Sequence, residues 1–598
     1  MDKNNKIIYY MQYLPMFLLL CVHPFIVYYK LYESRLSSFA WAPENPLAID
    51  FYLYYKQIFF LIISGIALLF TVFFLFQYKK RNELNNLRKQ QNMLVPLAVY
   101  AGLIILSSLF SKYKFIAFTG NDGQFESLFA ILGYLIIFLF LGLVLFCEHD
   151  FKMFTKIMWS SLVLTSLLGI LQFTGNNPIS WKWVQKLITP KGYLETGNTV
   201  TSVFETNRVF LFAYNPNYAG VLLALLSGFC FGMLITETVL WKRILEAILL
   251  LCLMASLIGT SSKAGLFTFV AIAIASLIFV RMKIKHPGRI VIGAGMIAVL
   301  GIILLFTIGS RLPITIQIKE LVSSEKIISN PLEEMVTDKE QVNFKYNGVS
   351  FSVAFNYQNG IFDFSVLEGS EAIPLRLSEN HEFYYLEQEN LEDVTIRPGI
   401  VDNTFPLFVI TLNGREWMFI KSGQEYFYLN QYLRLETLQN IERFGFKSNE
   451  SFATFRGLIW SMTLPILKDT LLLGTGADTF ACYFPQNNYK DLYYYIGDAV
   501  ASSRPHSMYL KIAVESGVLS LIALLTFFVW YMLQSVKLYR KCNFATLSSR
   551  VGFSCFIAVT IYLVCGLTND SMITVAPIFW CILGAGMAAN RINAKITI

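Results

Sequence analysis

The chain has 598 residues, of which 55% are hydrophobic and 15% are charged, and its formal net charge is +8. A soluble protein of this length would form several domains and carry more charge. The charged residues stand in short blocks between apolar runs that are long enough to cross a bilayer as helices. The composition therefore excludes a soluble protein, and membrane topology rather than nucleic-acid binding explains the basic excess.

The apolar runs predict about twelve transmembrane helices, because each run is close to the length that a helix needs to cross the hydrocarbon core. The first run is too long for the apolar part of a signal peptide and lacks a small-residue cleavage site, so we expect it to remain as the first span. The expected spans are residues 7–29, 57–77, 93–111, 127–147, 153–173, 213–235, 244–260, 265–282, 290–309, 517–535, 552–568 and 572–590.

Blocks of lysine and arginine between the apolar runs indicate the orientation of the chain. With twelve spans, the blocks after spans two, six, eight, ten and twelve fall on one side of the membrane. Because cytoplasmic loops carry the excess of positive charge, we expect both termini in the cytoplasm and residues 310–516 outside. The blocks contain Lys79, Lys80, Arg81, Arg88, Lys89, Lys242, Arg243, Arg281, Lys283, Lys285, Arg289, Lys537, Arg540, Lys541, Arg591 and Lys595.

The external segment begins with an acidic stretch that has the pattern of β-strands. Three Asn-Gly pairs separate runs in which apolar and polar residues alternate, and Asn-Gly tolerates the positive φ values of a two-residue hairpin turn. The stretch therefore predicts a small antiparallel β domain, which is either a spacer or lid or a module that binds a glycan or an acceptor. The three pairs are Asn347-Gly348, Asn359-Gly360 and Asn413-Gly414.

The predicted fold class is an all-α polytopic membrane protein with an inserted extracytoplasmic β-rich domain. Helices one to nine occupy residues 1–310, the β-rich insert 311–449, a helical and loop segment with the catalytic residues 450–516, and helices ten to twelve 517–598. Only Cys482 of the nine cysteines falls in the external region, so we expect no disulfide framework.

Basic side chains gather at the predicted external mouth of the helical bundle, although positive charge is disfavoured on that side. Arginine presents a planar fork that fits phosphate oxygens, and lysine acts as a point charge, so the group predicts an anionic ligand such as a diphosphate. The alternative is that these charges are topology signals or the ends of snorkelling side chains. The residues are Arg208, Lys263, Arg456, Arg504 and His506.

His506 is the candidate general base for an acceptor hydroxyl, because histidine titrates near neutral pH. Pro505 fixes its own φ and favours an extended conformation for Arg504, so this stretch is not expected to continue a helix. Glu515, just before the tenth span, is expected to orient the site. The simpler alternative is that His506 only caps the following helix or packs at the membrane interface.

Four groups of residues resemble motifs of the O-antigen ligase and polymerase family of bacterial surface polysaccharide assembly. The likeness covers residues 100–310 and 450–590, without the β insert. Two departures are Lys263, where the family usually has arginine, and His506-Ser507, where its usual pair is His-Asn. The groups are Arg208 with Asn-Pro-Asn-Tyr at 215–218; Thr-Ser-Ser-Lys-Ala-Gly at 260–265; residues 456–460 with 469–476 and Phe480; and residues 506–510 with Glu-Ser-Gly at 515–517.

This resemblance implies an integral-membrane glycosyltransferase of the bacterial cytoplasmic membrane. Such an enzyme takes a glycan from a polyprenyl diphosphate, such as undecaprenyl diphosphate, on the outer face of the membrane. It transfers the glycan to a lipid, a growing glycan or a protein, and needs no cofactor, nucleotide sugar or metal. The resemblance implies functional roles for His506, Arg504 and Arg456, with Arg208 and Lys263 as supporting charges. The implied partners are the lipid-linked donor, the acceptor and membrane lipid, and not nucleic acid.

Two other classes of protein would also need cations on this face or an external β domain. A transporter or flippase of lipid-linked glycan should contain inverted repeats and broken helices at the middle of the membrane, and neither is visible in the sequence. A membrane sensor with a ligand-binding β domain would leave the cationic mouth unexplained. Ligation, polymerisation and protein glycosylation all remain open as the reaction of a transferase.

Overall fold

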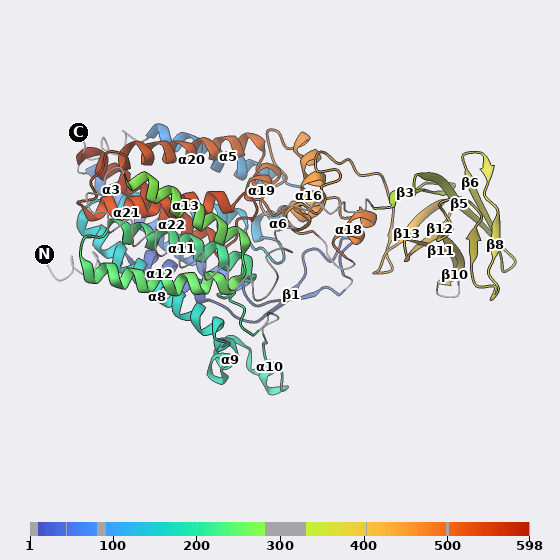
Figure 1. Cartoon of the computed structure of the whole chain (residues 1–598), viewed down its shortest axis with the longest axis horizontal. Helices are drawn as coiled ribbons and strands as arrows, with labels where there is room; N and C mark the ends of the chain where they lie inside the picture. The colour runs from blue at the N-terminus through green and yellow to red at the C-terminus, as the bar shows by residue number, and fades with distance from the viewer. Residues whose placement is uncertain are drawn as a thin grey trace.

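The computed structural model describes residues 10–43, 45–80, 91–201, 204, 206–281, 330–401, 404–497 and 502–596. Within these residues the chain forms a bundle of long helices, a β sandwich beyond one end of the bundle, and a layer of short helices and loops between the two (Figure 1). The helical bundle with a β-rich region confirms the broad fold class predicted from the sequence.

Eight of the described helices are long and apolar enough to cross a membrane, so the chain is a multi-pass membrane protein. Their spans are Tyr54–Gln77, Asn92–Phe110, Glu148–Phe173, Pro216–Thr236, Leu240–Thr260, Lys263–Val280, Val518–Tyr539 and Leu547–Cys565. They belong to helices α3 (Tyr54–Lys80), α5 (Gln91–Phe110), α8 (Glu148–Phe173), α11 (Pro216–Thr236), α12 (Leu240–Thr260), α13 (Lys263–Arg281), α20 (Val518–Tyr539) and α21 (Leu547–Cys565).

The other four expected spans differ from this pattern. The run expected at 7–29 contains a short apolar helical stretch, Leu14–Phe25, and the run at 127–147 becomes α7 (Leu128–Val144). The last becomes α22 (Ala576–Ile596), whose final turns contain Asn590 and Arg591 and which is not among the eight. The ninth expected span, 290–309, lies outside the described residues.

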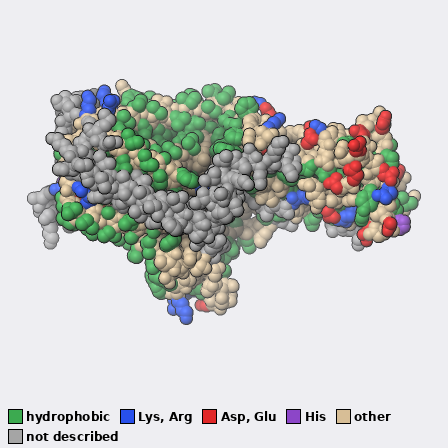
Figure 2. Space-filling model, viewed as in Figure 1, with side chains coloured by type: hydrophobic (Ala, Val, Ile, Leu, Met, Phe, Trp, Pro, Cys, Tyr) green, Lys and Arg blue, Asp and Glu red, His purple; other side chains and the backbone are tan. Residues whose placement is uncertain are grey.

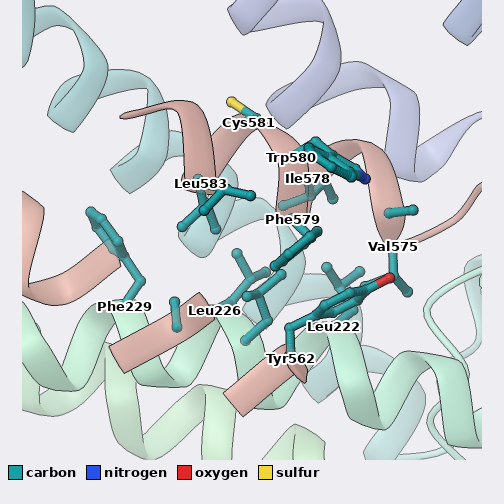
Figure 3. Packing of buried hydrophobic residues seen from close by; sticks show 14 of the residues in the cluster. Leu222, Leu226, Phe229, Tyr562, Val575, Ile578, Phe579, Trp580, Cys581 and Leu583 are labelled. Carbon is teal, nitrogen blue, oxygen red and sulfur yellow. The ribbon is translucent and has the colours of Figure 1, made fainter. Parts of the chain in front are cut away.

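Helix α11 occupies the centre of the bundle, and its membrane span is completely buried by protein. It packs against α12, α13 and α21. Figure 3 shows Leu222 and Leu226 of α11 beside Tyr562 of α21 and Phe579 of α22. The rings of Tyr562 and Phe579 are stacked with their centroids 4.0 Å apart. A helix buried on all sides needs no polar face, which is why the α11 sequence is almost entirely apolar.

The outer helices expose apolar side chains, as expected for surfaces that face lipid. On α3, for example, Leu69 and Phe76 are 72% and 69% exposed. Some lysine and arginine side chains lie at the end of the bundle away from the β sandwich, and others lie on the sandwich beside acidic side chains (Figure 2). The first turn of α12, with Lys242 and Arg243, lies at this end, and so do Arg540 and Lys541 directly after α20.

Two antiparallel sheets form the β sandwich. One sheet has the order β3-β4-β5-β6-β7 and the other β14-β13-β12-β11-β10-β9-β8. The strands are β3 (Leu332–Thr337), β4 (Val342–Tyr346), β5 (Val349–Gln358), β6 (Ile361–Glu368), β7 (Glu371–Ala372), β8 (Leu375–Leu377), β9 (Tyr384–Leu386), β10 (Thr395–Val401), β11 (Phe405–Leu412), β12 (Arg415–Ser422), β13 (Glu425–Leu429) and β14 (Leu435–Glu436).

The three Asn-Gly hairpins predicted from the sequence are confirmed. Each pair forms the two-residue turn between neighbouring strands, joining β4 to β5, β5 to β6 and β11 to β12. All six turn residues have positive φ, the conformation that a turn of this type requires. The alternating side chains of the two sheets meet in one aromatic core, in which Phe344 lies 5.5 Å from Phe419 and Phe355 lies 6.0 Å from Phe408, between ring centroids.

The sandwich rests on the layer of short helices between it and the bundle. This layer contains α16 (Phe452–Thr463), α17 (Phe480–Tyr483), α18 (Tyr489–Tyr495) and α19 (Met508–Glu515). Trp417 of β12 stacks on Tyr493 of α18, with ring centroids 5.8 Å apart. Arg434 donates hydrogen bonds to the backbone oxygens of Ser37 and Phe39, in the segment before β2 (Leu47–Asp50). The sandwich is therefore fixed to the same layer that carries the predicted catalytic residues.

Candidate active site

The segment from Ser502 to Ser507 crosses the mouth of the bundle without forming a helix, as Pro505 predicted. His506 has a φ of +53°, and the hydroxyl of Ser507 then caps α19 by accepting a hydrogen bond from the Leu510 amide. The amide of Met508 donates to the backbone oxygens of Gly566 and Asn569. The segment is thus tied to the connection between α21 and α22.

His506 faces a buried carboxylate from that connection. Nδ1 of His506 lies 3.4 Å from Oδ2 of Asp570, whose side chain is fully buried while that of His506 is 39% exposed. The Ser507 amide donates to Oδ1 of Asp570 at 3.1 Å, and the Tyr218 hydroxyl donates to Oδ2 at 3.3 Å. Burial alone would raise the pKa of Asp570, but His506, Arg504 and Lys511 outweigh burial and lower it.

Arg504 is buried beside this pair and is held by neutral groups. Nη1 donates to the Tyr218 hydroxyl at 2.8 Å, and Nη2 donates to the backbone oxygen of Gly123 at 3.3 Å. The guanidinium also lies over the ring of Tyr214, 5.4 Å from its centroid. Within the described ranges no carboxylate forms an ion pair with Arg504.

Arg456 approaches the same place from α16. Nη1 donates to the backbone oxygen of Ala453 at 2.8 Å, while the buried Nε has no hydrogen-bond partner among the described residues. Burial lowers the pKa of Arg456, against the opposing effects of nearby Asp570 and Tyr218. On the next turn of α16, Trp460 donates from Nε1 to the backbone oxygen of Pro505 at 2.8 Å, which holds α16 against the segment that carries His506.

Left-handed backbone flanks the site on two sides. Ala453, Thr454 and Phe455 have φ values of +52°, +63° and +61°, and Tyr214 has a φ of +70°. Residues other than glycine rarely adopt this backbone conformation. They do so mostly where the surrounding structure imposes it, often at functional sites. Here the strained residues directly precede Arg456 and carry the ring beneath Arg504.

Arg208 and Lys263 lie at the same end of the bundle but contact neither Arg504 nor His506 in the part of the chain that the structure describes. The residue after Arg208 donates its amide to the backbone oxygen of Gly259, at the end of α12. Lys263 is exposed at the first position of α13. Neither side chain forms a hydrogen bond or an ion pair with a described residue.

Glu515 is placed deeper than the other predicted residues. It is buried at the end of α19 and lines a cavity of about 40 Å³ together with Lys511, Glu126 and Ser571. Oε1 of Glu515 is buried and has no hydrogen-bond partner among the described residues. Burial raises the pKa of Glu515 to about 8, although Lys511 acts in the opposite direction.

The glycine-rich stretch after α16 explains how this part of the site is held. The amides of Thr475 and Gly476 donate to the backbone oxygens of Val514 and Glu515. A Cβ atom at Gly474 would lie 2.2 Å from the carbonyl carbon of Glu515, so only glycine allows the two backbones to approach this closely. The motif that resembled the family therefore packs against the end of α19.

Sequence reasoning did not identify Asp570, Lys511 or Glu126. Asp570 offered a signal, because it is an acidic residue between two closely spaced apolar runs on the predicted external side. Lys511 and Glu126 offered none, since they are 385 residues apart in the sequence and meet only in the fold. In the described part of the chain, no group of three or more His, Cys, Asp or Glu residues is arranged to hold a metal ion.

The arrangement combines a buried arginine, Arg504, and a half-buried arginine, Arg456, with a histidine backed by a buried aspartate, and among the described residues neither arginine forms an ion pair with a carboxylate. Such a site can bind an anionic group and accept a proton beside it. The fold and the site therefore define a multi-pass membrane protein with a cationic acid–base centre at one end of its helical bundle.

Comparison with known families identifies the chain more closely. Residues 247–525 match the family described as O-antigen ligase. The chain thus contains a domain of the O-antigen ligase family, which confirms the assignment predicted from its motifs. No curated protein matches the chain significantly.

Proposed function

We propose that the protein is a membrane glycosyltransferase that takes an oligosaccharide from a polyprenyl-diphosphate carrier and joins it to an acceptor hydroxyl. The family match supports a transferase of this general kind. The reaction is expected on the outer face of the cytoplasmic membrane, with the termini in the cytoplasm and the β sandwich outside. The acceptor is a lipid, a growing glycan or a protein.

The observation that carries the proposal is the pair Arg504 and Arg456. Arg504 is buried and Arg456 is half-buried beside Asp570, and among the described residues neither forms an ion pair with a carboxylate. The single negative charge of Asp570 does not neutralise two neighbouring guanidinium groups, and excess positive charge away from water is costly, so we expect an anionic ligand to complete the site. A diphosphate supplies the charge and the acceptor oxygens that two guanidinium groups match.

His506 would act on the acceptor. Asp570 faces Nδ1, which leaves Nε2 on the opposite edge of the partly exposed ring to receive a proton. In the proposed step, the acceptor oxygen attacks the anomeric carbon of the donor and its proton passes to Nε2. The bond from that carbon to the diphosphate oxygen breaks, and the electron pair leaves with the polyprenyl diphosphate. Arg504 and Arg456 stabilise the negative charge that develops on this leaving group.

The remaining predicted residues have supporting roles in this proposal. Arg208 and Lys263, which have no partners among the described residues, would attract the anionic donor to the mouth. Lysine in place of the family's usual arginine at position 263 acts as a point charge rather than as a bidentate fork. Glu515 would orient α19 from below and not contact the donor, because it is buried beneath the site.

The direct test uses purified protein in detergent with lipid-linked glycans extracted from source cells that lack it. We expect free polyprenyl diphosphate to be released together with a longer or newly linked glycan. A flippase would bind or move the same donor but would leave the bond between glycan and diphosphate intact. Binding without release of polyprenyl diphosphate would therefore refute the proposed function.

A further inference from the structure

Lys511 is a fully buried lysine one turn into α19, beneath the proposed site. Its ammonium group donates to Oε1 of Gln124 at 2.7 Å and lies 2.9 Å from Oε2 of Glu126 and 3.4 Å from Oδ1 of Asp478. Only 3% of its side chain is exposed. These partners come from two separate segments, so Lys511 links three parts of the chain that are distant in sequence.

Two of these contacts, those with Gln124 and Glu126, continue to a group beside a residue of the site. Gln124 donates from Nε2 to the backbone oxygen of Ser503 at 2.5 Å, directly before Arg504. Oε1 of Glu126 accepts a hydrogen bond from the hydroxyl of Ser571 at 2.7 Å, directly after Asp570.

The loop that supplies these two side chains is itself folded around Asp478. Oδ2 of Asp478 accepts hydrogen bonds from the amides of Asn121 and Glu126, at 2.5 and 2.9 Å. Lys511 is therefore connected to both segments that place Arg504, His506 and Asp570.

The charges of the cluster make the lysine necessary. Glu126, Asp478 and Glu515 surround Lys511, and Glu515 retains its proton near neutral pH because burial raises its pKa to about 8. The ammonium group then contacts both remaining carboxylates, which are almost completely buried, and offsets one of their two negative charges. Without Lys511 these carboxylates would repel each other in a poorly solvated place, and the loop that carries Gln124 and Glu126 would have to rearrange.

We propose that Lys511 is a positioning residue, which sets the geometry of His506 and Asp570 by fixing the loop of Gln124 and Glu126 between their two segments. Lys511 does not touch the donor or the acceptor. The inference rests on the proposed transferase function. Beyond that function, the rate of transfer depends on the buried cluster around Lys511. Binding of the donor diphosphate depends on Arg504 and Arg456.

The test compares variants that keep the buried charge balanced. Lys511→Met combined with Glu126→Gln removes one positive and one negative charge together, so the net charge of the cluster does not change. Asp478 keeps the hydrogen bonds from the backbone amides of Asn121 and residue 126. Gln124→Met is the milder variant, because it keeps Lys511 and both carboxylates. It removes the two hydrogen bonds of the Gln124 amide, one to the Ser503 oxygen and one from the Lys511 ammonium group. Lys468→Met, which alters a largely exposed lysine outside the site, is the matched control.

Transfer kinetics are measured with lipid-linked glycans extracted from cells that lack the protein. We expect kcat of the double variant to fall by at least about tenfold while KM for the donor stays within about threefold, because a displaced base costs rate more than donor affinity. Gln124→Met should also lower kcat without a matching change in KM for the donor, but its kcat should fall less. Lys468→Met should match the wild type.

Two results would overturn the inference. The first is a folded double variant whose kcat stays within about twofold of the wild type. The second applies if the double variant does not fold, and it is an unchanged kcat of Gln124→Met. His506→Ala in the same series separates the two proposals. Normal transfer by His506→Ala refutes the proposed function itself, whereas loss in His506→Ala with normal transfer in the folded cluster variants overturns only the role of Lys511.

Discussion

Nδ1 of His506 lies 3.4 Å from Oδ2 of Asp570, and the carboxylate is fully buried while the imidazole reaches the solvent-exposed mouth. The aspartate also accepts hydrogen bonds from the Ser507 amide and the Tyr218 hydroxyl. Its position is therefore fixed by three groups, two from the segment before α19 and one from α11. A histidine held in this way presents its other nitrogen in a defined direction, as a general base requires.

Asp570→Asn should lower the rate of glycan transfer by at least about tenfold, because the neutral amide no longer stabilises a protonated His506. Donor affinity should change little, since Arg504 and Arg456 remain. The transfer rate is measured as the initial rate with lipid-linked glycan. The donor affinity is measured as binding of undecaprenyl diphosphate in detergent micelles. Asp338→Asn, in the β sandwich, is the control. A normal rate in Asp570→Asn would show that the pair has no role in proton transfer.

Arg504→Lys and Arg456→Lys should each weaken binding of undecaprenyl diphosphate by roughly ten- to a hundredfold. Lysine keeps the charge but loses the forked donors, and a hydrogen bond to a charged group contributes about 1.5–3 kcal/mol. Calorimetry or fluorescence titration in micelles measures the change, and Arg397→Lys on the exposed face of β10 is the matched control. Unchanged affinity in both site variants would mean that the diphosphate binds elsewhere.

Glu515→Gln should stabilise the protein increasingly as the pH rises. The carboxyl ionises near pH 4.5 when unfolded, whereas burial raises its folded pKa to about 8. Between these values the folded state holds more protons than the unfolded state, so the wild type loses stability as pH increases. The variant has no such group. Thermal unfolding in detergent is measured at about pH 5 and about pH 8. The unfolding temperature of the variant relative to the wild type should be higher at about pH 8 than at about pH 5. A constant difference would contradict the burial argument.

Local turn chemistry and hydropathy predicted much of the fold from the sequence. Asn347-Gly348 and its two counterparts specify hairpin turns through their own φ preferences, and the alternating residues beside them specify the buried faces. The long apolar runs predicted the main helices, but length alone did not establish the number of spans. The run at 7–29, for instance, contains a helical stretch of only Leu14–Phe25.

The candidate site was only partly predictable. Arg504, His506 and Arg456 stood out because cations are unusual on the predicted external side. Asp570 forms its contacts with residues that are 63 and 352 positions away in sequence, and Lys511 meets Glu126 across 385 positions. Such contacts have no local pattern, so only the packing of α19 against the neighbouring loops brings them together.

The orientation in the membrane can be tested with one introduced cysteine. Lys339→Cys, on an exposed part of the β sandwich, should react with a membrane-impermeant maleimide in intact cells if the sandwich is extracytoplasmic. The native Cys147 is the internal control, because it is exposed at the opposite end of the bundle, between α7 and α8. It should react only after permeabilisation. The reverse pattern would place the sandwich in the cytoplasm and would exclude transfer on the outer face.

The central claim is that His506 activates the acceptor while the arginines hold the donor, and one comparison tests it most directly. His506→Ala and wild-type protein are measured in the same preparation for binding of undecaprenyl diphosphate and for the rate of transfer from lipid-linked glycan. We predict unchanged binding and a transfer rate lower by about 10²–10⁴-fold, the usual cost of removing a general base. Near-normal transfer by His506→Ala at saturating donor would contradict this account.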